Sequence, residues 1–154
     1  MSAGDHDDNP DHEHLIRAYF ESCNVGTPDQ IAAHFTADAI IYDTNHPPVK
    51  TAAGIGSFWE KVRAQWQGAV WAVDRVISDG ETAAIEWNMS GQGDRGRFVF
   101  RGSEHYAFED QLIAEIRQYW NFDRSSLDTG LVDYPYSELP DSLEQDGVNQ
   151  VEES

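Results

Sequence analysis

The feature that most constrains the fold is a pair of alternating runs, residues 97–108 and 112–122, joined by a short polar connection at 109–111. In both runs apolar and polar side chains largely alternate, and this period of two is typical of a strand with one face on a core. Two such runs with a short connection predict a long antiparallel hairpin. The side chains on the core face are Phe98, Phe100, Gly102, Glu104, Tyr106 and Phe108, then Leu112, Ala114, Ile116, Gln118, Trp120 and Phe122.

Glu104 is a carboxylate on a face that is otherwise largely aromatic. Glutamate is rarely buried without a partner, because removing its charge from water is costly. An aromatic wall would disfavour the charged form and raise the pKa, so that the side chain could be a neutral hydrogen-bond donor. Glu104 is therefore the first candidate for a functional residue.

The rest of the chain predicts three helices and three further strands. The expected elements are helices at 14–26, from Thr27 onward and at about 54–67, and strands at 39–43, 71–77 and 83–89. The apolar face of the second helix is assigned to Ile31, Ala32 and Phe35. Thr27 and Gln30 have the spacing of a capping box, with Pro28 in the first turn. Residues 123–136 are expected to wrap the body. Because the large aromatic sheet face must curl around helices to be buried, the sequence predicts an α+β cone with an internal pocket.

Length and charge restrict the classes of function. The chain has 154 residues, which suits a single domain at 14–136 between disordered acidic tails at 1–13, also His-rich, and 137–154. Its formal net charge of -18 makes nucleic acid and membrane surfaces unfavourable partners. The single Cys23 allows no internal disulfide, and no leader or membrane-spanning pattern is visible. We therefore expect a cytoplasmic protein.

Two further polar residues lie on apolar faces. Tyr19 is on the inward face of the first helix, where its hydroxyl needs a partner that a backbone carbonyl could supply. Asp43 continues the apolar stripe of the strand at 39–43 and precedes a loop stiffened by two prolines. At a polar pocket mouth, Asp43 would remain ionised and could act as a base, although a turn-forming Asp is common at such a position.

Three residue patterns could suggest a cofactor or metal, but none of them predicts one. Residues 91–96 match GxGxxG, but the motif lies between two strands with no helix to hold a pyrophosphate, so a hairpin loop is expected. The histidines of the N-terminal tail have no fixed geometry for a metal. His46, His105 and Glu104 would need a bulge to share an ion, because His105 and Glu104 point to opposite sheet faces.

The order of elements, with Tyr19–Gly26, His34–Ala39 and Ile113–Trp120, resembles the NTF2-like superfamily, in particular its ketosteroid isomerase-like and SnoaL-like branches. The resemblance covers about residues 15–122. It implies a cone-shaped α+β fold in which a curved, mixed or antiparallel sheet wraps three N-terminal helices. It also implies a homodimer that forms through the sheet.

The resemblance implies roles for three residues. Tyr19 and Glu104 fall on the two donors to a substrate oxyanion, and Asp43 falls on the general base. Glu104 replaces an aspartate of the family pattern, and His46 lies in a loop of altered spacing. The residues expected to line the substrate pocket are Trp120, Phe100, Tyr106, Trp59, Trp87 and His46.

These observations predict a cofactor-free acid–base enzyme, an isomerase, dehydratase or polyketide cyclase, for a small to medium hydrophobic carbonyl compound. Two other functions stay open. A non-catalytic ligand-binding or dimerisation module would pair Glu104 with Arg101, His105 or Arg117, or would fill the pocket with Trp59 or Trp87. Epoxide hydrolysis would need an Asp-Arg-Asp set on inward faces, which the pattern does not supply.

Overall fold

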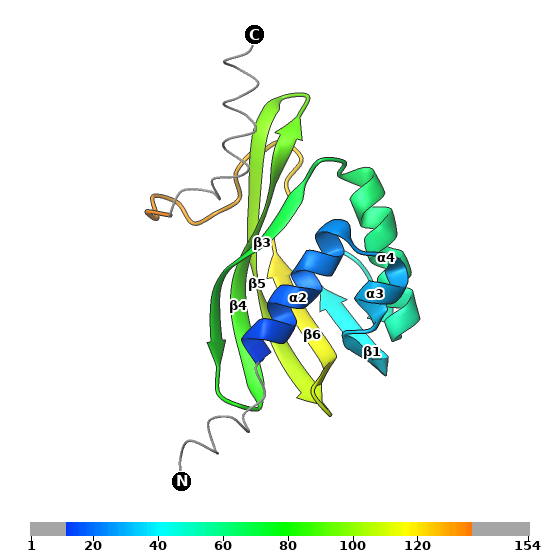
Figure 1. Cartoon of the computed structure of the whole chain (residues 1–154). Coiled ribbons are helices and arrows are strands. Elements are labelled where there is room, and N and C mark those ends of the chain that lie inside the picture. The colour runs from blue at the N-terminus through cyan, green and yellow to red at the C-terminus, as the bar shows by residue number, and fades with distance from the viewer. Residues whose placement is uncertain (1–11, 137–154) are drawn as a thin grey trace.

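A computed structural model describes residues 12–136 (Figure 1). Its helices are α2 (His12–Val25), α3 (Pro28–Ala32) and α4 (Ala52–Gln65), and its strands are β1 (Phe35–Asp43), β2 (Val49–Lys50), β3 (Val70–Ser78), β4 (Thr82–Gly93), β5 (Gly96–Glu109) and β6 (Leu112–Trp120). The tails predicted at 1–13 and 137–154 lie outside the described residues, apart from the first two residues of α2. None of the described helices is long and apolar enough to cross a membrane.

The strands form one mixed sheet in the order β2-β1-β6-β5-β4-β3. The predicted hairpin is confirmed as β5 and β6, and β3 and β4 extend it with antiparallel pairing. β1 joins the other side of β6 in parallel, so segments far apart in the chain become neighbours. Figure 1 shows the three helices gathered against one face of the curved sheet. The predicted α+β cone is therefore confirmed.

β1 begins at Phe35, earlier than the predicted start at residue 39. The sequence pattern assigned Phe35 to the second helix, but Phe35 pairs with Ile113 of β6 and the backbone amide of Ile113 donates to the His34 carbonyl at 2.9 Å. The register then shifts at an irregularity between Phe35 and Ile40. Pairing with β6 thus overrides the local apolar spacing.

The helices are fixed by caps and by close packing. The capping box of α3 is confirmed, since Thr27 and Gln30 exchange side-chain and backbone hydrogen bonds of 3.1 and 2.9 Å. The guanidinium of Arg63 on α4 donates to the carbonyls of Ser22, Cys23 and Gly26 at the end of α2. At Gly56, an added Cβ would lie 2.3 Å from the Pro28 carbonyl oxygen. A side chain there would push α3 and α4 apart, so glycine is required by the close approach.

The other face of the sheet carries the segment after β6. The backbone amide of Val99 donates to the Leu127 carbonyl, and that of Thr129 donates to the Val99 carbonyl, at 2.8 and 3.2 Å. The Arg101 guanidinium lies 3.7 Å from the centre of the Tyr136 ring. In Figure 1 this segment, in orange, runs on the side of the sheet away from the helices. It wraps the body as predicted. The GxGxxG stretch is a hairpin, with Gly93 paired to Gly96.

Candidate active site

The site is built on one row of residues across three strands. In the strand register Asp43 of β1 pairs with Gln118 of β6, and Gln118 pairs with Glu104 of β5. Paired residues point to the same face of a sheet, and neighbouring strands are about 4.8 Å apart. The backbones of Asp43 and Glu104 are therefore separated by about 10 Å, with one amide side chain between them.

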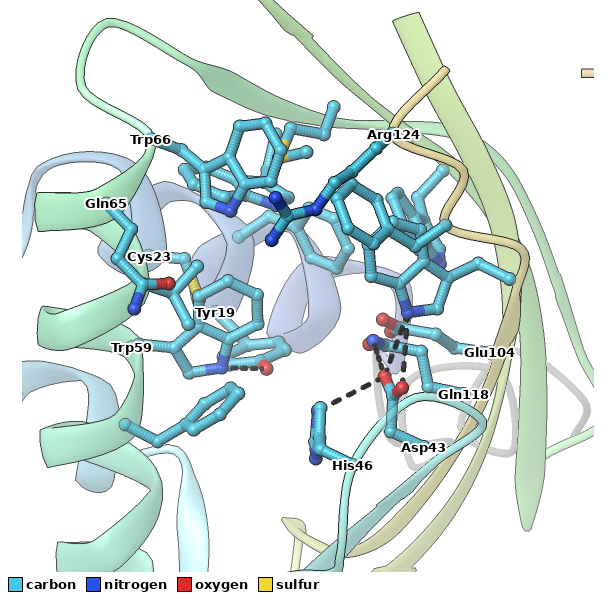
Figure 2. A pocket seen from close by; sticks show the side chains of 18 residues that line it. Tyr19, Cys23, Asp43, His46, Trp59, Gln65, Trp66, Glu104, Gln118 and Arg124 are labelled. Carbon is cyan, nitrogen blue, oxygen red and sulfur yellow. Dashed lines mark hydrogen bonds and ion pairs between the residues drawn. The ribbon is translucent and has the colours of Figure 1, made fainter. Parts of the chain in front are cut away.

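This row faces a cavity of about 620 Å³ between the sheet and the helices. All five tryptophans of the chain line the cavity, which makes its wall largely aromatic: Trp59, Trp66, Trp71, Trp87 and Trp120. Figure 2 shows Tyr19 and Trp59 on one side of the cavity and Glu104, Gln118 and Asp43 on the other. The three residues proposed from the sequence as catalytic thus line one cavity, as do His46, Trp59, Trp87 and Trp120.

Glu104 is buried, with 2% of its surface exposed. The Tyr106 hydroxyl donates to Glu104 Oε1 at 2.5 Å. Burial raises the pKa of Glu104 to about 8; the Tyr106 hydrogen bond opposes this shift and the nearby charge of Asp43 adds to it. At neutral pH the side chain is therefore mostly a neutral acid, and its second oxygen can carry a proton toward the cavity.

Asp43 was expected in a polar part of the pocket, and its side chain is fully buried among polar groups. Polar donors take the place of water around it. Gln118 Nε2 donates to Oδ2, Trp120 Nε1 donates to the same oxygen at 3.0 Å, and the amide of Asn45 donates to Oδ1 at 2.7 Å. His46 Nε2 lies 3.5 Å from Oδ2. The carboxylate is thus held in a fixed orientation at the cavity wall.

Tyr19 is 1% exposed and its hydroxyl accepts a hydrogen bond of 2.8 Å from Trp59 Nε1. The sequence suggested a backbone carbonyl as an acceptor for this hydroxyl, whereas the partner in the structure is the Trp59 indole, which is a donor. Burial is the main cause that raises the pKa of Tyr19, with the nearby Cys23 and Glu104 adding to it. The phenol therefore keeps its proton. Its oxygen accepts from Trp59, and its O–H is directed to the Cys23 sulfur, so donation to a ligand in the cavity would replace the contact with Cys23.

Two residues predicted to line the pocket lie behind its wall. Phe100 does not line the cavity but packs against the rings of Trp66, Trp120 and Phe122, which do. Tyr106 is 1% exposed and does not line the cavity. It lies two residues after Glu104 on β5, and its hydroxyl donates a hydrogen bond to the Glu104 carboxyl group. Alternation predicts the sheet face of a residue but not its distance from the open end of a cone, which explains both errors.

The ion pairs that the binding-module hypothesis predicted for Glu104 do not form. Arg101 pairs with Asp74 at 3.4 Å and Arg117 pairs with Glu115 at 2.6 Å. His105 packs edge-on against the Tyr119 ring, on the face opposite Glu104. Trp59 and Trp87 form part of the wall and leave the cavity open.

Sequence reasoning missed several residues of the site. Gln118 lies on the predicted apolar face of β6, and a buried amide needs partners just as a buried carboxylate does. Trp66 and Trp71 lie in the helix expected at 54–67 and the strand expected at 71–77, where an aromatic residue is no signal of a site. Arg124 follows β6 in a segment without periodicity, so no sequence pattern signals its place at the cavity.

The fold and the aromatic cavity are those of an NTF2-like protein. The SnoaL-like domain family matches residues 16–116, and the chain belongs to this family. A comparison with curated proteins finds no match.

Three solved structures show the same fold. A protein of unknown function with a cystatin-like fold from Methylobium petroleophilum PM1 is 27% identical, with a TM-score of 0.63 over 80% of this chain and 86% of that chain. An NTF2-like protein of unknown function from Cytophaga hutchinsonii is 22% identical, with a TM-score of 0.60 over 73% and 99% of the two chains. A protein with a ketosteroid isomerase-like fold from Catenulispora acidiphila, in complex with trimethylamine, is 15% identical, with a TM-score of 0.62 over 73% and 88%.

Proposed function

We propose that the chain is a cofactor-free acid–base enzyme that moves a proton from the carbon next to a carbonyl group of a hydrophobic compound. The observation that carries this proposal is a neutral acid, Glu104, in the same cavity as the carboxylate Asp43. Two carboxyl groups with such different environments can divide the roles of acid and base. Isomerisation, dehydration and aldol-type cyclisation all begin with this proton transfer.

In the proposed reaction Asp43 accepts the proton from the substrate carbon, and the electron pair of the broken C–H bond moves to the carbonyl oxygen. Glu104 and Tyr19 stabilise the resulting oxyanion by donating hydrogen bonds to it. Asp43 then returns the proton to carbon, or the intermediate expels a leaving group or attacks a second carbonyl. Gln118, Trp120 and Asn45 hold Asp43 in place and are positioning residues. Each acid or base group positioned in this way typically accelerates a reaction by about 10²–10⁴-fold.

The aromatic wall supports a hydrophobic substrate. Apolar rings exclude water and so strengthen each hydrogen bond to the developing charge. A cavity of about 620 Å³ is within the range of about 300–1,000 Å³ that holds small ligands in proteins.

The second candidate function is a non-catalytic ligand-binding module. The observation in its favour is that both oxygens of Asp43 already accept hydrogen bonds, so the carboxylate can act as a structural anchor between β1 and β6. Epoxide hydrolysis has less support, since among residues 12–136 no arginine that lines the cavity is paired with a carboxylate.

The test uses 2-tetralone, a hydrophobic ketone, dissolved in D₂O. Proton NMR measures the rate at which its α-protons exchange for deuterium. We expect the full chain to accelerate exchange and Asp43→Asn to remove most of the acceleration, by about 10²-fold or more. Asp38→Asn, an exposed position on the same strand, is the matched control and should exchange like the wild type. Equal rates for Asp43→Asn and the wild type would refute the assignment of the base. Binding of the ketone without any exchange would favour the binding module.

A further inference from the structure

Arg124 is the one arginine or lysine among the described residues that line the cavity. It lies in the segment after β6, on the exposed side of the wall. Figure 2 shows its guanidinium reaching over the cavity toward Trp66, while His46 and Asp43 lie at the opposite end of the view. A cation therefore stands at one end of an aromatic cavity and the proposed base stands at the other.

No carboxylate within residues 12–136 lies at ion-pair distance from Arg124. Six other basic residues of the described part also lack a carboxylate partner, but none of them lines the cavity. Several arginines of the described part are engaged: Arg17 with Glu13, Arg101 with Asp74 and Arg117 with Glu115. No carboxylate of the described residues accepts from the Arg124 guanidinium, so its N–H donors can bind an acceptor group of a ligand.

We propose that the ligand of this cavity carries an anionic group, a carboxylate or a phosphate ester, that Arg124 binds at the end remote from Asp43. Guanidinium presents paired N–H donors that fit either group. The net charge of -18 repels anions in general, so a local cation is what allows an anionic ligand to bind. The proposal rests on the proposed function only in assigning the opposite end to the reacting carbonyl. Together they describe the substrate as a hydrophobic keto acid or keto phosphate.

Two alternative roles of Arg124 predict different binding preferences. If the guanidinium only covers the aromatic rings near Trp66, its loss weakens every ligand to the same extent. If the five tryptophans form a cage for a cationic ligand, an ammonium compound binds better than an acid. Four probes with the same ring system and different charge separate these cases.

The experiment is isothermal titration calorimetry of the full chain with 2-naphthylacetate, 2-naphthyl phosphate, 2-naphthylacetamide and 2-naphthylmethyl-trimethylammonium at low ionic strength. We expect at least one anion to bind about tenfold more tightly than the neutral amide, as a charge-assisted hydrogen bond at a partly exposed site provides. The two anionic probes distinguish a carboxylate site from a phosphate site. The preference should decrease as salt is added.

Arg124→Gln should remove the preference for the anion and leave the affinity for the amide unchanged. Arg97→Gln is the matched control, because Arg97 is exposed on β5 and does not line the cavity. The proposal is overturned if the amide or the ammonium compound binds as tightly as both anions. It is also overturned if Arg124→Gln keeps the preference or weakens all four probes equally.

The binding measurement also separates this inference from the proposed function. Asp43→Asn should keep the preference for the anion, since Arg124 is remote from Asp43. A preference for anions together with unchanged exchange in Asp43→Asn refutes the base and leaves the anion site standing. Loss of exchange in Asp43→Asn without any preference for anions refutes the anion site alone.

Discussion

Replacing Glu104 by Gln should make the protein more stable at alkaline pH, because the amide cannot ionise. The pKa of Glu104 is about 8 in the folded protein, and its ordinary value of 4.5 applies in the unfolded chain. The folded state therefore holds this proton over a pH range in which the unfolded state has lost it. The stability that the neutral acid contributes is complete below pH 4.5 and is lost as the pH rises toward and through about 8.

The size of the effect follows from the two pKa values. Each pKa unit corresponds to 1.36 kcal/mol, so ionisation of Glu104 costs the folded state up to about 5 kcal/mol at high pH. Between pH 5 and pH 8 the wild type should lose about 3 kcal/mol relative to Glu104→Gln. With a urea dependence of about 1–3 kcal/mol per M, the unfolding midpoints of the two proteins should separate by about 1–3 M over this range.

The assay is urea unfolding at pH 5, 6, 7 and 8, followed by tryptophan fluorescence. Comparison with the variant at each pH removes the contribution of the other 27 acidic residues, which both proteins share. Glu21→Gln, an exposed position on α2, is the control and should follow the wild type at every pH. A difference between Glu104→Gln and the wild type that does not change with pH would refute a buried neutral acid at this position.

Three further predictions concern the site. Tyr19→Phe removes an oxyanion donor and the acceptor of the Trp59 indole. Turnover in the exchange assay should therefore fall about 10²–10³-fold, and the free energy of unfolding should fall by about 1–2 kcal/mol. Unchanged turnover would exclude Tyr19 as a donor. The exchange rate of the wild type should decline as the pH rises through about 8, where Glu104 loses its proton, and a rate that rises steadily through this range would contradict its role as an acid. Gly102→Ala places a Cβ 2.6 Å from Trp87 Cζ2 and 2.7 Å from the Tyr119 carbonyl oxygen. Thermal unfolding should therefore show that the free energy of unfolding falls by about 1–3 kcal/mol. A variant as stable as the wild type would mean that the cavity wall is packed more loosely at this position than the structure indicates.

Much of the fold was predictable because local patterns and tertiary contacts agree. The alternation in residues 97–122 specified both strands and the face of Glu104, and the Thr27–Gln30 capping box specified where α3 begins. The prediction failed at Phe35, where parallel pairing with Ile113 outweighed helical spacing. Local periodicity carries no information about a partner strand almost eighty residues away.

The individual candidates for the site were also predictable, because a polar side chain on an apolar face is improbable without a reason. Glu104 and Asp43 were found in this way, and the same rule would have found Gln118. Tyr106 was wrongly predicted to line the pocket, and Arg124 was not found at all. Whether either residue lines the cavity depends on how far its position lies from the open end, which alternation along a strand does not specify.

The sequence by itself therefore determined the order of the elements, the face of most strand residues and the presence of carboxyl groups among aromatic rings. The alternation failed at Ile113, which is buried in the core next to a register shift between β5 and β6. Only the tertiary structure decided that Asp43, Gln118 and Glu104 form one row, that donors surround Asp43, and that Arg124 stands over the cavity. The physical reason is that side-chain direction is a local property of the backbone, whereas register, burial depth and pKa depend on neighbours brought together by the curved sheet.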